Sequence, residues 1–561
     1  MKTFRSITSN CTLLFLTFII ACQNDTSSTE HQSNAIVDAS KPLPVESLIQ
    51  ELQHSFDSAS GPSVLLWKGD TVSHPEAIQK FYRDRQFQPV WLNAQGLYAR
   101  TFQLFDALDS LYYEGLQPAQ YQVTWFRQQA EGIKSGNITQ TNALLEFETG
   151  MTLTFFKAAS DMVIGRDFKS KKNKDWMNKN DSLFDEVLIL NRALKYPMQD
   201  AFTAMRPDHP WYIKFRNEFI HLDALKKMGG LKPIQGLRDS IPMGDSLPGV
   251  ADLRKRLYQE INWPKDTLSP YWNDDVLQSV KKFQHLHQLK PTGKLDTTTL
   301  KKLNAGIEEK MQTLALNMER MRWLGHDFEQ PYIWVDIPKM EMDYYEKDSV
   351  QFNMRVVVGR PGRATPTLDT RVENIVFSPP WIVPPTIMRE EVVPGIARRG
   401  GAYLARRGLR AYDRRGRPVS ASAINSKNFR SFSIGQSPGY NSSLGEVKFN
   451  MPNPWSIYMH DTPHREDFPK AYRAFSSGCV RVQKPKEFAA FLLRNPEQYS
   501  YEKIDSICKL RRTIFVPMKR KVNVHFVYLT NGIDSAGNVM YLKDVYGLDK
   551  KYFGQDAVGK K

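Results

Sequence analysis

The chain has 561 residues, of which 41% are hydrophobic, 12% aromatic and 24% charged. This length is too great for a single hydrophobic core, and the composition excludes a disordered or fibrous chain, so we expect two to four folded domains. The formal net charge of +16 favours a polyanionic partner. Nucleic acid, anionic lipid headgroups and carboxylate-rich polymers all meet that condition, so charge alone does not choose among them.

The N-terminus has the pattern of an export signal. Lys2 and Arg5 precede the apolar run 13–21, which is far shorter than the ~20 residues of a membrane-spanning helix. The run ends in Ile-Ile-Ala-Cys at Cys22 and resembles the lipobox of bacterial lipoproteins, which implies cleavage after residue 21 and a lipid on Cys22. The alternative is an ordinary secretory signal with an incidental Cys22. Both alternatives predict export from the cytoplasm.

Two cysteines remain in the predicted mature chain. Cys11 is lost with the signal and Cys22 carries the lipid, which leaves Cys479 and Cys508. Two cysteines do not make a disulfide framework, although a single bridge is compatible with an oxidising compartment.

Composition and periodicity divide the rest of the chain. The polar stretch 22–45 predicts a flexible tether, and apolar residues at helical spacing predict a helical scaffold over 46–245, in which the stretch 144–162 is a core helix. Residues 246–304 predict three short helices, and 305–329 a linking helix. From residue 330 the apolar period changes to two, which predicts a β-rich domain.

A histidine and a cysteine in this β-rich region are candidates for catalysis. His460 ends an apolar, strand-like run, and Cys479 follows Ser-Ser-Gly in a turn of small residues. A neighbouring imidazole can activate a thiol whose ordinary pKa leaves little thiolate at neutral pH. A chance pairing and zinc ligation are the alternatives, although the sequence has no Cys-x-x-Cys pair. We expect no metal and no organic cofactor.

The wider pattern resembles the YkuD-type L,D-transpeptidase domain. His460-Asp461 is followed by Ser477-Gly478-Cys479-Val480-Arg481, and flanks such as Thr365-Pro366-Thr367 and Pro380-Trp381-Ile382 are similar to the large YcbB-type branch. The resemblance implies an α+β multidomain fold with a β-sandwich catalytic domain over 330–521, a lid insertion over about 378–450 and a C-terminal extension over 522–561.

The segment Leu253–Asn304 resembles a small peptidoglycan-binding domain, with Ser279–Gln284 at its centre. It departs from that family at Pro291-Thr292-Gly293, where an acidic residue usually precedes the glycine. A structural spacer is therefore as compatible with the sequence as a binding domain.

The resemblance also implies roles for individual residues. Cys479 is the nucleophile and His460 the base, with His464 as a competing base and Asp461 as a potential activating partner. Gly478 and Tyr458 line an oxyanion hole. The substrate-binding candidates that complete the set are Ser477, Arg481 and Trp381. For Arg481 a structural salt bridge is the equal alternative, and Tyr458 has the alternative of packing in its strand.

The implied reaction cross-links peptidoglycan. Cys479 attacks the third residue of a tetrapeptide stem, expels D-alanine and leaves a thioester, which an amine of a second stem then attacks. The alternatives are an L,D-carboxypeptidase that uses water and a non-catalytic wall-binding lipoprotein. A carbapenem is the expected covalent inhibitor, and the periplasm, with a lipid anchor in the outer membrane of a Gram-negative bacterium, is the expected location.

The predicted lid insertion is strongly basic. Between Arg389 and Pro418 the sequence has nine arginines against three acidic residues. These arginines are candidates for attracting anionic stems or for excluding water, and a solvated basic loop is the alternative. The sequence has no nucleic-acid recognition motif, and nucleic-acid binding conflicts with the export signal, so we expect no nucleic-acid partner.

Overall fold

The computed structural model describes residues 35–56, 66–67, 70–71, 75–166, 184–325, 328–425 and 427–558. The predicted signal 1–21 and the lipidation candidate Cys22 lie outside these residues. The described chain divides into two compact units. One contains the helices up to residue 221 together with 314–325, and the other contains 222–313 and 328–558.

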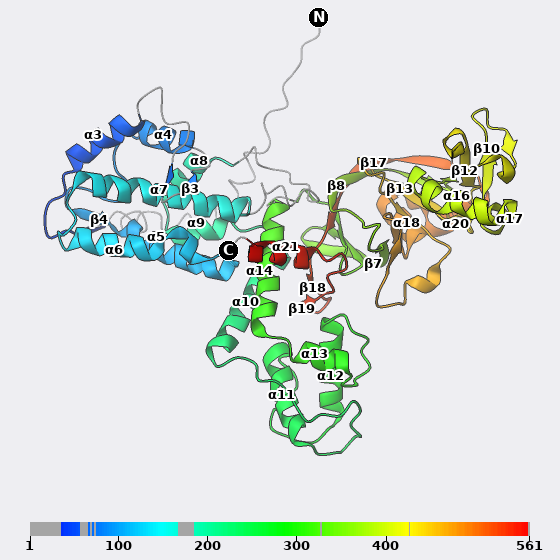
Figure 1. The fold of residues 1–561 in the computed structure, drawn as a ribbon, viewed down its shortest axis with the longest axis horizontal. Coiled ribbons are helices and arrows are strands. Elements are labelled where there is room, and N and C mark those ends of the chain that lie inside the picture. The colour runs from blue at the N-terminus through cyan, green and yellow to red at the C-terminus, as the bar shows by residue number, and fades with distance from the viewer. Residues whose placement is uncertain are drawn as a thin grey trace, which may run out of the picture. The chain divides into compact units, whose positions relative to one another are not determined.

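The first unit is helical, as predicted (Figure 1). Its helices are α3 (Val45–Phe56), α4 (Pro75–Asp84), α5 (Ala99–Ser110), α6 (Val123–Lys134), α7 (Thr141–Val163), α8 (Glu186–Ala193), α9 (Met198–Ala204) and the first part of α10 (Pro210–Lys227). α7 contains the predicted core stretch 144–162. Its side chains are buried on almost every side, so this helix forms the centre of the unit's hydrophobic core.

The predicted tether is too long. Residues Ile36–Asp38 form β1, which pairs antiparallel with β4 (Gly96–Tyr98), and Leu43 is buried in the core of the helical unit. Average composition missed this strand because its hydrogen-bond partner lies about sixty residues further along the chain.

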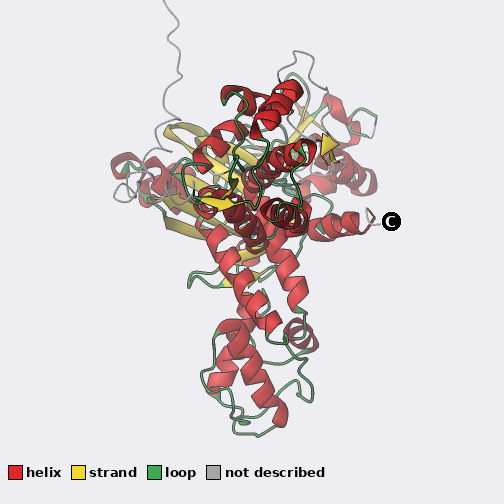
Figure 2. Ribbon diagram, turned by 90° about the vertical axis from the view of Figure 1, so that its left-hand side faces the viewer, coloured by secondary structure: helices red, strands yellow, loops and turns green. Residues whose placement is uncertain are grey.

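The three short helices predicted in the second unit are present as α11 (Pro248–Ile261), α12 (Asp274–Leu286) and α13 (Thr297–Leu303). The Asn273 and Asp296 side chains accept hydrogen bonds from the first-turn amides of α12 and α13, and these N-caps fix where the two helices begin. Figure 2 shows these helices with long loops between them. Ile234 and Ile241 belong to their core, so this three-helix module begins before the predicted residue 246.

The linking helix α14 spans Ile307–Trp323, inside the predicted range 305–329. The strand-rich domain follows it. One nine-stranded sheet contains β5 (Tyr332–Asp336), β6 (Glu341–Glu346), β7 (Ser349–Gly359), β8 (Leu368–Phe377), β13 (Val447–Asn450), β14 (Met459–His460), β15 (Ala474–Ser476), β16 (Val480–Val482) and β17 (Ile514–Val527).

The order of this sheet is β15-β7-β16-β14-β13-β8-β17-β5-β6, and β6 also pairs with β7. The sheet therefore closes on itself through β7, and the two layers expected of a β-sandwich are parts of one closed sheet. One face carries the core, together with apolar residues of α18 (Pro485–Leu493) and α20 (Tyr501–Lys509), which follow β16. The short helix α19 (Pro496–Tyr499) connects them.

The predicted insertion forms a small lobe with its own core between β8 and β13. Its elements are β9 (Trp381–Ile382), α15 (Pro385–Ile387), the π-helical turn Met388–Val392, α16 (Val393–Arg399), α17 (Gly401–Arg406), β10 (Arg410–Tyr412), β11 (Pro418–Val419) and β12 (Ser433–Gln436). The lobe is shorter than the predicted 378–450, because β13 pairs with β8 and β14 in the main sheet.

The predicted boundary at 521/522 falls inside a strand. β17 pairs with β8 on both sides of that point and with β5 from Asn523 onward, so the first residues of the expected extension belong to the sheet. Beyond it lie β18 (Asn531–Ile533), β19 (Val539–Tyr541) and α21 (Leu548–Val558). In the part of the chain that the structure describes, no helix has the length and apolarity that a membrane crossing requires.

Candidate active site

The parallel pairing of two short strands brings the candidate residues together. β14 and β16 align Met459 with Val480 and His460 with Arg481, and the Val480 amide donates to the Tyr458 carbonyl. Met459 and Val480 are buried in the domain core. Because side chains alternate across a strand, Tyr458, His460, Cys479 and Arg481 share the opposite face. Extended by one residue, the register places Cys479 across from Tyr458 and diagonally from His460.

The Cys479 sulfur lies among groups that act on its ionisation in opposite directions. Its Sγ is 3.9 Å from the Ser456 carbonyl oxygen, an acceptor for the neutral thiol. Burial raises the pKa of the Cys479 thiol, while hydrogen bonds from the Tyr458 amide and hydroxyl and the positive charges of Lys448 and Arg481 oppose that shift. In the free protein Cys479 is therefore a thiol, and the Tyr458 amide and hydroxyl are placed to donate hydrogen bonds to the thiolate when it forms.

His460 is in the form that a base requires. Its Nδ1 lies 2.5 Å from the Asp461 carbonyl oxygen. A carbonyl only accepts, so Nδ1 carries the proton and Nε2 has the free lone pair. Burial, and next the charge of Arg481, lower the pKa of the imidazole to about 3. His460 is thus neutral at physiological pH, and its Nε2 lone pair is free.

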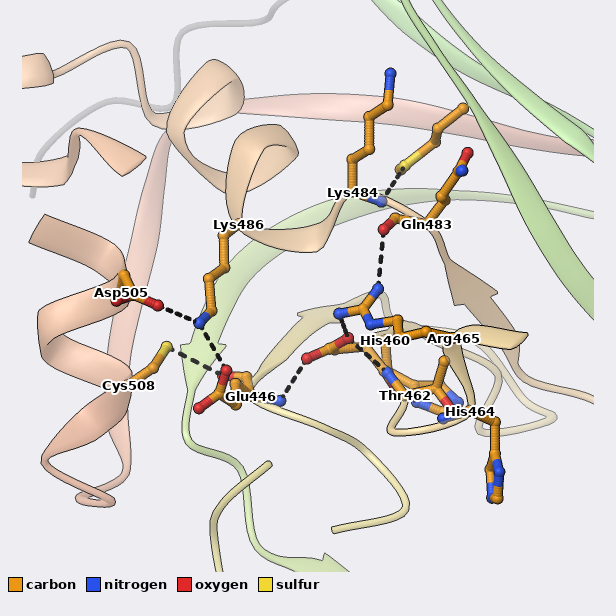
Figure 3. A network of polar contacts seen from close by, with 12 residues as sticks. Glu446, His460, Thr462, His464, Arg465, Gln483, Lys484, Lys486, Asp505 and Cys508 are labelled. Atoms are coloured by element: carbon orange, nitrogen blue, oxygen red, sulfur yellow. Dashed lines mark hydrogen bonds and ion pairs between the residues drawn. The ribbon is translucent and has the colours of Figure 1, made fainter. Parts of the chain in front are cut away.

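The Asp461 carboxylate supports the backbone beside His460 and does not contact the imidazole. It accepts hydrogen bonds from the amides of Glu446 (2.8 Å) and Thr462 (2.6 Å) and forms an ion pair with Arg465. Lys486 links Glu446 to Asp505 on α20, with both contacts at 2.6 Å. Figure 3 shows this chain of contacts extending from α20 to the His460 strand. Asp461 therefore acts on His460 through its own backbone carbonyl.

Gly445 is required for this arrangement. Its φ is +58°, and a Cβ at this position would lie 2.4 Å from the Asp461 Cγ. Only glycine adopts this backbone without strain while leaving space for the carboxylate.

Lys448 is a site residue that sequence reasoning did not single out. It lies opposite His460 in the β13–β14 register, and its Nζ is 4.1 Å from the centre of the Tyr458 ring. Burial lowers the pKa of its ammonium, and the Cys479 thiolate acts in the opposite direction. Apolar and polar residues alternate along β13, which indicates a strand. The pairing of β13 with β14, which places Lys448 at the site, is not visible in the sequence.

Arg481 has the salt bridge that was its structural alternative. Its Nη1 lies 3.4 Å from Asp467 Oδ2, which anchors the guanidinium beside His460. Arg481 therefore affects the imidazole through its charge.

The turn before Cys479 is fixed by the backbone of Gly478. Its φ of +115° is open mainly to glycine, its amide lies 3.2 Å from Ser476 Oγ, and its carbonyl accepts from Thr365 Oγ1 at 2.7 Å. The Gly478 amide already has an acceptor, so in this structure Gly478 shapes the turn, and Tyr458 is the donor that reaches Cys479.

Of the remaining candidate residues, Trp381 and Ser477 lie near the nucleophile, whereas His464 does not. Trp381, from β9 of the insertion, is a hydrogen-bond partner of the Tyr458 hydroxyl, and Ser477 is exposed beside the nucleophile. His464 has the His-x-x-x-His spacing relative to His460, yet its exposed ring contacts Glu466 at 3.2 Å and points away from the network (Figure 3). Among the described residues, no group of three or more His, Cys, Asp or Glu side chains is placed to bind a metal.

The two cysteines of the domain are both free and differ in environment. Cys508 is buried on α20 with its Sγ 3.6 Å from the Glu446 carbonyl, and burial raises the pKa of its thiol to about 12. Cys508 is therefore a poor nucleophile and serves as an internal control for Cys479.

Comparison with protein families gives three matches. Residues 76–219 match the scaffold domain family, 246–303 the family described as "Putative peptidoglycan binding domain", and 330–522 the YkuD family, described as the L,D-transpeptidase catalytic domain. The chain therefore carries a scaffold domain, a peptidoglycan-binding domain and a YkuD-type L,D-transpeptidase catalytic domain. The YkuD-family match contains β14, β16 and all the candidate catalytic and substrate-binding residues.

Similar proteins include a "Putative L,D-transpeptidase" of Haemophilus influenzae, 32% identical over 243 residues. The match covers 43% of this chain and 48% of that protein, so it spans about half the relative's length. Similar solved structures include an ertapenem-acylated L,D-transpeptidase catalytic domain from E. faecium, which is 13% identical. That match covers 36% of this chain and 99% of the E. faecium chain, with a TM-score of 0.18. An L,D-transpeptidase from Stackebrandtia nassauensis has 12% identity, 52% and 97% coverage, and a TM-score of 0.20.

The ionisation of Cys479 gives a prediction for its alkylation. Because its thiol pKa is raised, the thiolate fraction in the free protein is small at pH 6 and grows about tenfold per pH unit below the pKa. We expect the rate of iodoacetamide labelling at Cys479, read by peptide mass mapping, to follow that slope between pH 6 and 8. Cys508→Ala leaves the rate unchanged. A rate that is constant over this range indicates a preformed thiolate–imidazolium pair and contradicts the account.

Proposed function

We propose that this protein is an L,D-transpeptidase that cross-links peptidoglycan in the bacterial cell envelope. The observation that carries the proposal is the β14–β16 register, in which Cys479 and His460 share one face of a YkuD-family domain. The peptidoglycan-binding match of the three-helix module supports the substrate class and the location in the periplasm. A lipid on Cys22 that anchors the protein in the outer membrane is part of the proposal and rests on the sequence pattern.

The first half of the proposed reaction forms a thioester. Cys479 Sγ attacks the carbonyl carbon of the third stem residue while its proton passes to His460 Nε2. The Tyr458 hydroxyl and amide, which contact the thiol in the free protein, are the proposed donors to the developing negative charge. Collapse breaks the carbon–nitrogen bond, and the proton on His460 passes to the amine of the departing D-alanine.

The second half transfers the acyl group. The amine of a neighbouring stem attacks the thioester, gives a proton to His460 and expels the Cys479 thiolate. The proton then returns to sulfur, so the enzyme ends as it began. The raised pKa of Cys479 and the lowered pKa of His460 keep both groups neutral between turnovers, and they oppose the transfer of the proton from sulfur to Nε2. Lys448 and Arg481 stabilise the thiolate as it leaves.

Substitution of the nucleophile tests the reaction. We expect Cys479→Ala to abolish cross-links between third residues of two stems, and His460→Ala to lower their rate at least about 100-fold, as loss of a general base does. The measurement is a mass-spectrometric digest of peptidoglycan incubated with purified protein. Cys508→Ala is the matched control and retains activity. Undiminished cross-linking by Cys479→Ala contradicts the mechanism, whereas release of D-alanine without cross-links identifies a carboxypeptidase.

Acylation by a carbapenem tests the site without a peptidoglycan substrate. We expect one drug mass to be added to the intact protein and mapped to Cys479, because a strained lactam carbonyl needs the same nucleophile and proton transfer as the stem. His460→Ala slows this addition. An unmodified Cys479 after prolonged exposure supports a non-catalytic wall-binding protein instead.

A further inference from the structure

Two arginines outside the proposed machinery converge on the turn of the nucleophile. Arg360 and Arg363 lie on the loop between β7 and β8, and their Nη1 atoms are 3.5 and 3.1 Å from Ser477 Oγ. Ser477 is exposed and two residues before Cys479. Two guanidinium groups therefore lie next to the position where a substrate of Cys479 must bind.

This loop is fixed to the same turn through its backbone. Thr365 Oγ1 accepts from the Gly359 amide at 2.9 Å and donates to the Gly478 carbonyl at 2.7 Å. The Tyr546 hydroxyl accepts from the Thr365 amide and donates to the Gly359 carbonyl, at 3.1 and 2.7 Å. The arginines and the nucleophile thus share one hydrogen-bonded support.

Besides the Ser477 hydroxyl, two carboxylates contact these arginines in this structure. Arg363 contacts Glu390 at 2.5 Å and Glu391 at 3.0 Å, and Arg360 contacts Glu391 at 3.4 Å. Both glutamates lie in the π-helical turn of the insertion. Residues 381–436 contain eleven lysines and arginines but only three acidic residues, of which these are two. Both glutamates also contact an arginine of the lobe, Glu390 with Arg389 at 3.0 Å and Glu391 with Arg407 at 3.5 Å, so they bridge the lobe to the arginine pair.

The glutamate contacts are open to exchange. The side chains of Glu390 and Glu391 are 42% and 31% exposed and that of Arg360 is 42% exposed, whereas that of Arg363 is 12% exposed. Water and salt screen the accessible carboxylates and the Arg360 pair, which weakens these contacts, while Arg363 is held in place beside Ser477. Another carboxylate that is held nearby can replace them, and the planar guanidinium geometry favours carboxylates over other anions.

We propose that Arg360 and Arg363 form a carboxylate-binding site beside Cys479, which Glu390 and Glu391 occupy in the free protein and the terminal carboxylate of the donor stem occupies during reaction. The identity of that carboxylate rests on the proposed transpeptidase function, because the departing D-alanine carries it one residue beyond the attacked carbonyl. The site itself rests on the contacts of the free protein. The insertion then competes with the donor for the arginines.

A pair of small alkylating agents tests the site without any stem peptide. Iodoacetate and iodoacetamide react with the same Cys479 thiolate but differ in a carboxylate. We expect the ratio of their labelling rates, iodoacetate over iodoacetamide, to fall about fivefold in Arg363→Gln and to rise in the double variant Glu390→Gln/Glu391→Gln. The iodoacetamide rate reports on the fold of each variant.

The control is Arg417→Gln, which removes an exposed arginine of the same lobe that pairs with Asp413 at 2.7 Å, away from these contacts. Its ratio stays at the wild-type value, and Arg363→Lys restores part of the loss because it keeps the charge. An unchanged ratio in Arg363→Gln overturns the proposal, as does a fall in the glutamate double variant.

Donor stems identify the carboxylate. We compare a tetrapeptide donor with its C-terminal amide. In Arg363→Gln the KM of the free acid rises about fivefold at unchanged kcat, while the KM of the amide does not change. Equal effects on both donors exclude the terminal carboxylate as the ligand. If no donor is turned over by the wild type, the proposed function fails, and the alkylation ratio still decides the arginine site.

Discussion

The hydrogen bond from the Val480 amide to the Tyr458 carbonyl sets the register on which the site depends. In a parallel pair a shift of one residue exchanges the two faces of a strand, so the same sequence in another register separates Cys479 from His460. β14 and β16 are only two and three residues long. The closed sheet on both sides and the core residues Met459 and Val480 keep these short strands in place.

Electrostatics then gives the two reacting groups complementary protonation states. Burial favours the neutral form of both, since desolvation raises the pKa of Cys479 and lowers that of His460. The donors from Tyr458 and the charges of Lys448 and Arg481 act on the thiolate only when it forms. Asp461 determines which imidazole nitrogen is free, through its backbone oxygen, while its carboxylate joins β14 to α20 through Glu446 and Lys486.

Local sequence patterns predicted the helices and strands, whereas the positions of several site residues depend on strand pairing between distant segments. The apolar stretch of α7, the three helices α11 to α13 and the period of β5 were all visible in the sequence. The strand-like run that His460 ends is a strand only at Met459–His460, because the Asn453 side chain makes four hydrogen bonds that form a turn before it, with Ser456 in a left-handed conformation at φ 54°. Motif resemblance supplied Cys479 and His460. Lys448, Arg360 and Arg363 depend on strand pairing and loop packing, which no local pattern contains.

The central claim is that Cys479 carries the acyl group between two stems. Rapid acid quenching of the protein with a tetrapeptide donor and no acceptor, followed by peptide mapping, measures that intermediate directly. The account predicts an adduct on Cys479 with the mass of the donor less D-alanine, formed at the rate of D-alanine release and lost when an acceptor amine is added. D-alanine release with Cys479 unmodified at every time point would contradict it.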